Sequence, residues 1–272
     1  MTTEVLLPEG DAQPEGRIGF GAFLDAEWIK IRTVRSTFWT LVALAVVSIG
    51  LTVLFCALSA NSIANGSERD THPDELISVG VVFGQVAALV LGVLVMSSEY
   101  ATGMIRATLT AMPRRTTVLI AKALVLAAML FVIGTIVAFL GYFAGNAFLD
   151  AKDIGVPLSQ DGVVRALIGN GLYLAVLGLF GFALALLMRH TAGAITVGLG
   201  MIFVIGSLVG LLPGTWGDWV AKLMPGNAGA QVTVVHQYHS DQLGPWTGFG
   251  VFCAEIAVLL VLGWLRFTRK DA

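Results

Sequence analysis

Residues 98–122 read Ser98-Glu-Tyr-Ala-Thr-Gly-Met-Ile-Arg-Ala-Thr-Leu-Thr-Ala-Met-Pro-Arg-Arg-Thr-Thr-Val-Leu-Ile-Ala-Lys122, a polar and basic island between two long apolar segments. The apolar run before the island ends at Met96, and the next one begins at Thr117 and continues to Phe148. A run of about 20 apolar residues is long enough for a helix to cross a bilayer. The island is therefore predicted to connect two transmembrane helices.

The middle of the island is predicted to form a short amphipathic helix from Thr102 to Met112. Ile105, Leu109 and Met112 recur at helical spacing and give this helix one apolar face. Pro113 ends it, because proline has no backbone N–H and disfavours helical geometry in the residue before it. Such a helix, on the basic side of a membrane, is expected to lie against the membrane surface, where a cytoplasmic partner can reach it.

The composition indicates an all-α polytopic membrane protein. Of the 272 residues, 56% are hydrophobic and only 12% are charged, and the mean hydropathy is +0.83. A soluble globular domain carries about twice that share of charge. Residues 20–272 are predicted to form one transmembrane domain whose six spans are Phe38–Ser59, Leu76–Ser97, Val118–Phe148, Val164–Met188, Ala192–Leu212 and Trp246–Phe267.

Two features precede the first span. Residues 1–19 are polar and acidic and lack the apolar core of a signal peptide, so a disordered tail is predicted. From Phe20 to Ser36, apolar residues recur on one helical face, which predicts an amphipathic helix in the membrane interface. This helix either contacts a partner protein or has no role beyond setting the orientation of the chain in the membrane. The residues singled out on it are Trp28, Ile31, Arg32 and Arg35.

The lysines and arginines predict the orientation. Twelve of the 16 fall on one side of the predicted spans, and only Arg69, Lys152, Arg165 and Lys222 fall on the other. Because cytoplasmic loops carry the excess of positive charge, both termini are predicted to be cytoplasmic. Arg114, Arg115 and Lys122 are interpreted as part of this orienting charge, in contact with lipid phosphates.

The sequence shows no catalytic set and no metal site. His236 and His239 lie three residues apart near Asp241, but two histidines without a third ligand are more often loop residues. Cys56 and Cys253 both fall in apolar runs, which favours buried thiols over a disulfide. A nucleic-acid-binding function is excluded by the lack of a basic surface outside the loops that flank the membrane. The chain contains no P-loop motif, so any ATP that drives it must bind another polypeptide.

Glu255 is the one acid deep inside a predicted span. An intramembrane carboxylate is costly and faces protein or water. Glu255 is either a pathway or gating group or a protonated acid that is hydrogen-bonded to a neighbouring helix. No basic partner is expected for it inside any span.

Glycines are spaced for close helix packing. Three pairs have the Gly-x-x-x-Gly spacing that lets membrane helices approach closely. Such pairs serve either packing within the chain or a dimer interface. They are Gly80 with Gly84, Gly141 with Gly145, and Gly206 with Gly210.

The island also carries a family resemblance. The pattern Glu99-Tyr100-x-x-Gly103-x-Ile105-Arg106-x-x-Leu109-x-Ala111-x-Pro113-Arg114-Arg115, with Lys122 behind it, resembles the signature of ABC-2 type transporter permeases, the membrane subunits of bacterial ABC exporters. Pro225-Gly226-Asn227-Ala228-Gly229 is a weaker likeness. The number of segments and the loop lengths are similar over most of the chain.

The apolar spans, with few intramembrane charges, favour an amphipathic or hydrophobic cargo, such as a drug, an antimicrobial peptide or a lipid. The resemblance implies a permease that moves its cargo out across the cytoplasmic membrane. It implies pairing with a second permease, as a homodimer or heterodimer, and docking of an ATPase subunit that holds ATP and Mg²⁺. It also implies that the N-terminal helix packs against that ATPase and that residues 213–245 dip back into the membrane. The implied coupling residues are Glu99, Gly103, Ile105, Arg106, Leu109 and Pro113.

Two other functions stay open from the sequence. An integral-membrane enzyme acting on lipids would need a polar cluster at one interface, and the neighbourhood of His236 to Asp241 is the candidate. An ATP-independent carrier would need several intramembrane polar groups, of which Glu255 is one. Within the permease interpretation, Glu99 is expected to face the N-terminal end of the 102–112 helix, where a carboxylate is favourable.

Overall fold

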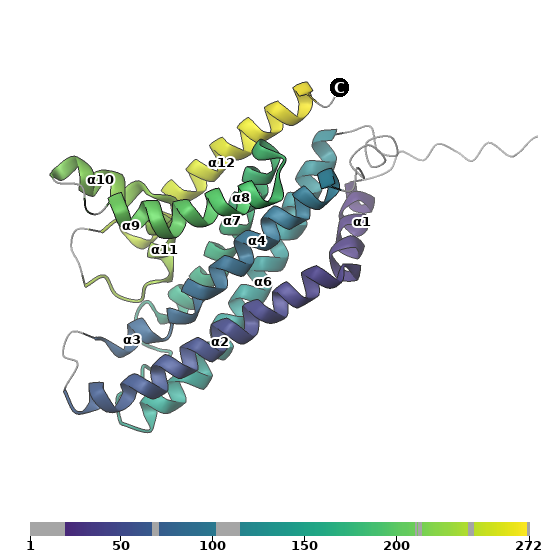
Figure 1. Ribbon diagram of the computed structural model, residues 1–272. Helices are drawn as coiled ribbons and strands as arrows, with labels where there is room; N and C mark the ends of the chain where they lie inside the picture. The colour runs from purple at the N-terminus through teal and green to yellow at the C-terminus, as the bar shows by residue number, and fades with distance from the viewer. Residues whose placement is uncertain are drawn as a thin grey trace, which may run out of the picture.

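The computed structural model of the chain is a bundle of long helices (Figure 1). It describes residues 20–66, 71–101, 115–209, 211, 214–238 and 242–270, and no strand occurs among them. Six of the helices that these residues form are long and apolar enough to cross a membrane. The chain is therefore an all-α, multi-pass membrane protein, as the sequence predicts.

Each predicted span coincides with one long helical segment, and the boundaries differ by at most five residues. The fifth span is composite, because an α-helix passes into a π-helical stretch and back. The six spans are α2 (Arg35–Ala64), α4 (Val79–Ala101), α6 (Arg115–Asp150), α7 (Val163–Met188), the series α8 (Thr191–Leu199), η1 (Gly200–Ile205) and α9 (Gly206–Val209), and α12 (Pro245–Lys270).

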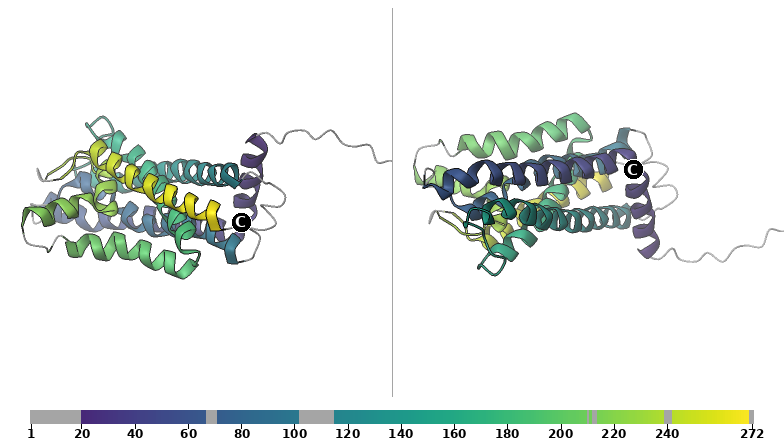
Figure 2. Two further views of the ribbon diagram at one scale, coloured as in Figure 1. Left: turned by 90° about the horizontal axis from the view of Figure 1, so that it is seen from above. Right: turned by 90° about the horizontal axis from the view of Figure 1, so that it is seen from below.

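The shorter helices lie at the two ends of the bundle. They are α1 (Phe20–Thr33), α3 (Pro73–Leu76), α10 (Thr215–Leu223), α11 (Pro225–Ala230) and η2 (Gln231–Thr233). Helix α1 lies across one end of the bundle, and the C-terminal end of α12 lies at the same end (Figure 2). We call this the α1 end and the opposite one, where α3, α10 and α11 lie, the α3 end.

Helix α7 is the centre of the bundle. Most of its residues are buried, and it packs against α4, α6 and α12. Glycine makes the contact with α4 possible, because a Cβ atom on Gly92 would collide with the carbonyl oxygen of Gly178. Inside a bilayer, close backbone approach of this kind is a main source of helix association, since burial from lipid supplies little hydrophobic gain.

Two of the predicted glycine pairs serve packing within the chain. Gly80 and Gly84 bring α4 close to α2, and the Gly80 N–H donates a hydrogen bond of 3.1 Å to Thr52 Oγ1. Gly141 and Gly145 bring α6 to the same face of α2. That face consists of Ser48, Thr52 and Cys56, all buried. The third pair includes Gly210, which lies outside the described residues.

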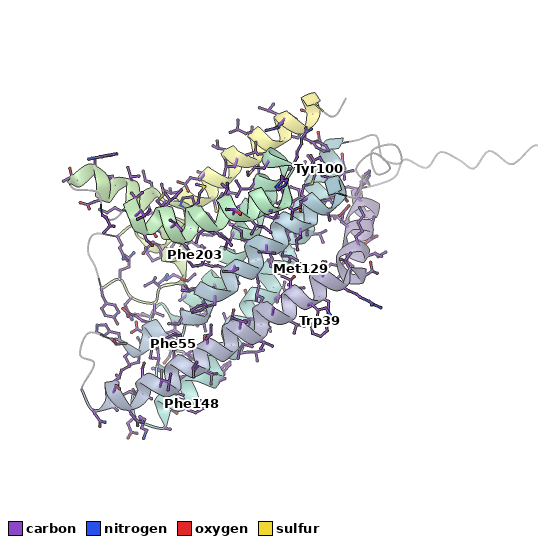
Figure 3. All side chains as sticks on the ribbon, viewed as in Figure 1. Trp39, Phe55, Tyr100, Met129, Phe148 and Phe203 are labelled. Atoms are coloured by element: carbon purple, nitrogen blue, oxygen red, sulfur yellow. The ribbon has the colours of Figure 1, made fainter. Side chains whose placement is uncertain are left out.

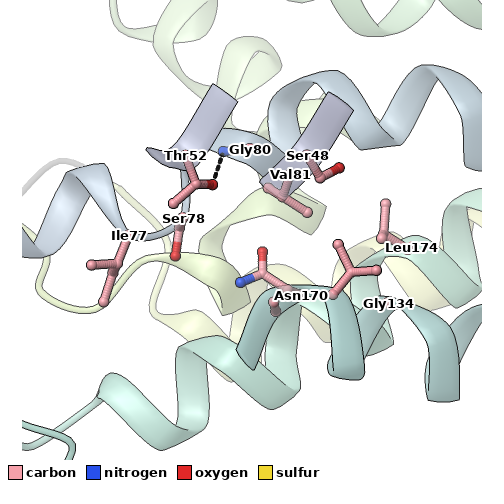
Figure 4. A pocket seen from close by; sticks show the side chains of 11 residues that line it. Ser48, Thr52, Ile77, Ser78, Gly80, Val81, Gly134, Asn170 and Leu174 are labelled. Atoms are coloured by element: carbon pink, nitrogen blue, oxygen red, sulfur yellow. Dashed lines mark hydrogen bonds between the residues drawn. The ribbon is translucent and has the colours of Figure 1, made fainter. Parts of the chain in front are cut away.

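A small pocket lies beside this contact (Figure 4). Its volume is about 20 Å³, which is enough for about one water molecule. Its lining is partly polar, because it includes Ser48 and Asn170. Ser48 Oγ and Asn170 Oδ1 are buried and have no hydrogen-bond partner among the described residues.

The outer surface of the bundle is apolar. Trp39, Phe55 and Phe148 are 66%, 38% and 47% exposed, whereas Met129 in the interior is 7% exposed (Figure 3). Large exposed apolar side chains along a helical bundle indicate contact with lipid rather than water.

The segment before the last span is helical and partly buried. The helix predicted near Asp218 to Met224 is present as α10, and α11 carries the Pro225 to Gly229 motif, with Pro225 and Gly229 buried. Helix α11 packs against α12 and η1. The depth of this segment in the membrane stays a prediction.

Candidate functional site

A network of four charged residues lies at the α1 end, where α1, α4 and α6 meet. Lys122 Nζ lies 2.5 Å from Glu27 Oε2 and 2.9 Å from Glu99 Oε1. Lys30 Nζ lies 2.7 Å from Glu99 Oε1 and 3.3 Å from Glu27 Oε1. Two acids and two bases thus alternate, and every member contacts two others. We call Glu27, Lys30, Glu99 and Lys122 the ion network.

The ion network is largely removed from solvent. The side chain of Lys122 is 2% exposed, and those of Glu27 and Glu99 are 6% and 5% exposed. Burying charges costs several kcal/mol per ion, and this cost is recovered only when partners and geometry are good. The balance of two positive and two negative charges is therefore what allows Lys122 to remain inside the bundle.

Lys30 is the member nearest to solvent, with 35% of its side chain exposed. Burial by itself lowers the pKa of Lys30, but the hydrogen bonds and charges of Glu99 and Glu27 outweigh this effect. The pKa of Lys30 is therefore raised above its ordinary value of 10.5, and the ammonium form persists at neutral pH.

The apolar face of α1 brings the ion network together. Phe23 is buried against Val118 and Ala121 of α6. Glu27 lies one helical turn after Phe23, so it is on the same face of α1, and Lys122 directly follows Ala121. Docking of Phe23 therefore places the Glu27 carboxylate against the Lys122 ammonium.

Glu99 also borders a groove between α1, α2 and α4. The groove has a volume of about 280 Å³. Glu99 Oε2 is buried and has no hydrogen-bond partner among the described residues, although Oε1 accepts from both lysines. Oε1 of Glu99 is thus held by the two lysines, whereas Oε2 can still accept a hydrogen bond.

Tyr100, which follows Glu99 at the end of α4, is held by Arg189. The guanidinium of Arg189 lies over the Tyr100 ring, 5.7 Å from its centroid, which is within cation–π range. Arg189 adopts the left-handed conformation, with φ 56°, at the tight turn between α7 and α8. His190 follows and caps α8, because its Nδ1 accepts from the Gly193 N–H at 3.0 Å. The end of α4 is therefore linked to α1 and α6 through Glu99 and to α7 through Tyr100.

The structure corrects the interpretation of Lys122. The sequence indicated an orienting charge in contact with lipid phosphates, but Lys122 is buried and bonded to two carboxylates. Lys122 lies within α6, the third span. Hydropathy missed this pairing because its two acids lie 95 and 23 residues away in sequence.

The other predicted coupling residues lie outside the described part of the chain. Residues 102–114 are not described, so the helix from Thr102 to Met112 and the roles of its residues stay predictions. Glu99 itself belongs to α4 rather than to that helix. The coupling residues outside the described part are Gly103, Ile105, Arg106, Leu109 and Pro113.

The predicted N-terminal helix is present as α1, but only part of its predicted face is buried. Trp28 is 48% exposed, whereas Phe23 and Glu27 are each 5% exposed. Arg35 is exposed at the first residue of α2. Ile31 and Arg32 belong to α1, and their side chains lie outside the described part. The helical spacing of Glu27 from Phe23 was a signal that sequence reasoning missed.

Glu255 lies in α12, separate from the ion network. Its side chain is half-buried, and Oε2 is buried without a hydrogen-bond partner among the described residues. No pairing with Lys or Arg is seen for it within the described residues. Both interpretations of Glu255, as a pathway group or as a neutral acid, stay predictions.

His236 has an acidic partner that the sequence did not suggest. Its Nδ1 lies 3.0 Å from Asp74 Oδ2, and Tyr238 donates a hydrogen bond of 2.8 Å to Asp74 Oδ1. His239 and Asp241 lie outside the described residues. Within the part of the chain that the structure describes, no group of three histidine, cysteine or acidic residues is arranged to hold a metal ion.

Comparison with known proteins gives one match. Residues 75–272 match a family described as "Protein of unknown function (DUF2705)". No curated protein matches the sequence. The matched region begins in α3 and includes α4 and α6. It therefore contains Glu99 and Lys122 of the ion network but not Glu27 and Lys30, which lie in α1.

Proposed function

The chain belongs to the DUF2705 family, and we propose that this member is the membrane-spanning permease subunit of an ATP-driven exporter, powered by a separate ATPase subunit. The proposal draws on six spanning helices, on the resemblance of residues 99–122 to ABC-2 permeases, and on the absence of a P-loop in the sequence. The membrane is the cytoplasmic membrane, with both termini in the cytoplasm.

The observation that supports this proposal best is the ion network. Glu99 lies in the last turn of α4, before residues 102–114, and Lys122 lies in the second turn of α6, after them. The pair therefore joins the two helices that flank the proposed coupling segment, and Glu27 and Lys30 add α1 to the same unit. Ionisable groups inside a membrane protein are costly and commonly mark functional elements.

This connection gives a mechanism for coupling. When two ATPase subunits bind ATP and close, they press on residues 102–112. Because Glu99 and Lys122 hold the ends of α4 and α6 together, the push moves both helices and α1 as one body. If the helices were separate, much of the push would be absorbed as local bending. Motion of α4 and α6 relative to α7 then changes access to the cargo pathway.

The assembly follows from the same reasoning. Two permeases, either two copies of this chain or one copy with a similar partner, form the pathway, and each docks one ATPase. The cargo is amphipathic or hydrophobic, because the spans contain few charged groups apart from the ion network and Glu255. ATP and Mg²⁺ bind the ATPase subunits, and no cofactor is assigned to this chain.

The proposal is tested by co-purification and reconstitution. The full chain is co-expressed in turn with P-loop ATPase subunits from the same genome, and the detergent-purified complex is placed in liposomes. We expect a stable complex that hydrolyses ATP, whereas the chain alone shows no hydrolysis above background. Failure of the two polypeptides to associate, or transport by the chain without any ATPase, would overturn the proposal.

A matched pair of variants tests the coupling role. Glu27→Gln removes one charge of the ion network, and Asp25→Asn removes an exposed charge from the same helix. We expect Glu27→Gln to lower cargo movement per ATP hydrolysed by about threefold or more, a typical size for a coupling change. Asp25→Asn should leave that ratio unchanged. Equal ratios for both variants would remove the coupling role from the ion network.

A further inference from the structure

A large cavity lies at the α3 end, away from the ion network. Its volume is about 500 Å³, within the range of small-molecule sites. Its walls come from α3, α4, α7, η1, α11 and the chain that follows α11. No sequence pattern predicts this cavity, because the segments that line it are far apart along the chain.

The mouth of the cavity is acidic. Asp74 is 4% exposed and accepts from Tyr238, while His236 lies against its other oxygen. The ring of His72 stacks on that of Tyr238, with centroids 3.7 Å apart. Burial, together with the hydrogen bond to Asp74, raises the pKa of Tyr238, so its phenol stays a neutral donor. Glu75 adds a second, exposed carboxylate.

The charge of the lining favours a cationic ligand. Among the described residues that line the cavity are two carboxylates, Asp74 and Glu75, and neither a lysine nor an arginine. A carboxylate as buried as Asp74 is stabilised by positive charge nearby, and among the described side chains that line the cavity His236 is the one able to supply it. A bound cation would add to that stabilisation.

The inner end of the cavity is polar as well. Tyr173 is fully buried and donates a hydrogen bond of 2.6 Å to Gln85 Oε1. Gln85 is 7% exposed, and its amide nitrogen has no hydrogen-bond acceptor among the described residues. From Val79 to Gln85 along α4 is about 9 Å, at 1.5 Å per residue. The cavity thus reaches well inside the bundle and ends at an unused donor.

The part of the cavity between its mouth and its inner end has an apolar wall, and this wall reaches the outer face of the bundle. Val82 and Phe203 line the cavity and are 46% and 39% exposed on the face of the bundle. Phe203 belongs to the π-helical stretch η1, a rare geometry that is frequent at functional sites. The opening therefore joins an acidic mouth at the bundle end to an apolar flank.

We propose that this cavity binds an amphipathic organic cation, with its charge beside Asp74 and Glu75 and its apolar body between Val82 and Phe203. A purely polar cation would gain nothing from the apolar flank, and a neutral apolar molecule would gain nothing from the acids. The assignment of this ligand as cargo rests on the proposed exporter function, whereas the binding itself does not.

Binding is measured on the full-length chain in lipid nanodiscs, with empty nanodiscs subtracted. The probe is methyltriphenylphosphonium, and its neutral counterpart of similar shape is triphenylphosphine oxide. We expect saturable binding of the cation at one site, and binding of the oxide weaker by about tenfold or more, as for the loss of one charge interaction. Equal binding of both probes, or no saturable binding of the cation, would overturn the proposal.

Three variants locate the site. Asp74→Asn removes the buried charge and should weaken binding of the cation by about tenfold. Val82→Trp fills the flank without touching the Asp74 contacts, so it should block binding even if Asp74→Asn fails to fold. Asp161→Asn, an exposed acid at the same end but outside the cavity, is the control. Wild-type binding by Val82→Trp would place the ligand elsewhere and overturn the assignment.

The two proposals fail separately. If the phosphonium binds this cavity but no ATPase associates with the chain, the binding site stands and the exporter function falls. If a complex with the ATPase moves another cargo while the phosphonium does not bind, the exporter function stands and this inference falls.

Discussion

Lys122 Nζ lies 2.9 Å from Glu99 Oε1, and this contact joins the last turn of α4 to the second turn of α6 around an undescribed segment of 13 residues, 102–114. Both side chains are at least 95% removed from solvent. The contact therefore does more than neutralise charge, because it fixes the separation of α4 and α6 near the two helix ends that flank residues 102–114.

Removal of Lys122 alone should be strongly destabilising. Lys122→Met leaves two buried carboxylates with Lys30 as their single base, and breaking a buried pair in this way costs about 3–5 kcal/mol. Glu27→Gln combined with Lys122→Met should recover much of the loss, because the Lys30–Glu99 pair at 2.7 Å remains. Thermal unfolding of the detergent-purified variants measures this. Lys152→Met, at an exposed lysine, is the control, and a Lys122→Met variant as stable as that control would contradict the expectation.

The backbone contact between α4 and α7 should tolerate no side chain. Gly92→Leu would force α4 away from Gly178, and the forced separation should cost several kcal/mol, as for other overpacked sites. Gly50→Leu is the matched control, because a Cβ atom at Gly50 meets nothing within 4 Å. The fraction of monodisperse protein after extraction reports folding. Equal yields from the two variants would mean that α4 and α7 are less tightly packed than described.

The two ends of the bundle should be accessible from opposite sides of the membrane. Ser159 and Thr116 are both exposed, near the α3 end and the α1 end respectively. In a background without Cys56 and Cys253, a cysteine at Ser159 should react with an impermeant thiol reagent in intact cells, and one at Thr116 should react only after the cells are opened. Labelling of Thr116 in intact cells would reverse the predicted orientation.

Alkaline pH should weaken the contribution of Lys30. Its pKa is raised in the folded chain by Glu99 and Glu27, so its stabilising contribution is present below the unfolded value near 10.5 and is lost as the pH rises through the raised value. The difference in thermal midpoint between the wild type and Lys30→Met should therefore be constant from about pH 8 to about pH 10 and shrink above that. A difference in thermal midpoint that grows at alkaline pH would mean that the pKa of Lys30 is lowered, not raised, in the folded chain.

Much of the fold could be predicted from the sequence because it is encoded locally. The run from Val164 to Met188 predicts α7 within one residue, since a span is defined by consecutive apolar residues. Gly80 and Gly84 predicted a close helix contact because small residues at this spacing have that effect with any partner helix. Glu99 was identified as a site residue from its place in a motif, but its two lysine partners were not.

The sequence by itself determined that this chain is a multi-pass helical membrane protein, which segments cross the membrane and where close helix contacts can form, because hydropathy and residue size act over short stretches of chain. Only the tertiary structure decided which charges pair and where a cavity forms. Glu27 meets Lys122 across 95 residues, and Asp74 meets His236 across 162. Such pairs depend on how whole helices dock, as Phe23 docks on Val118 and Ala121, and docking is set by the summed packing of many distant residues rather than by any one stretch.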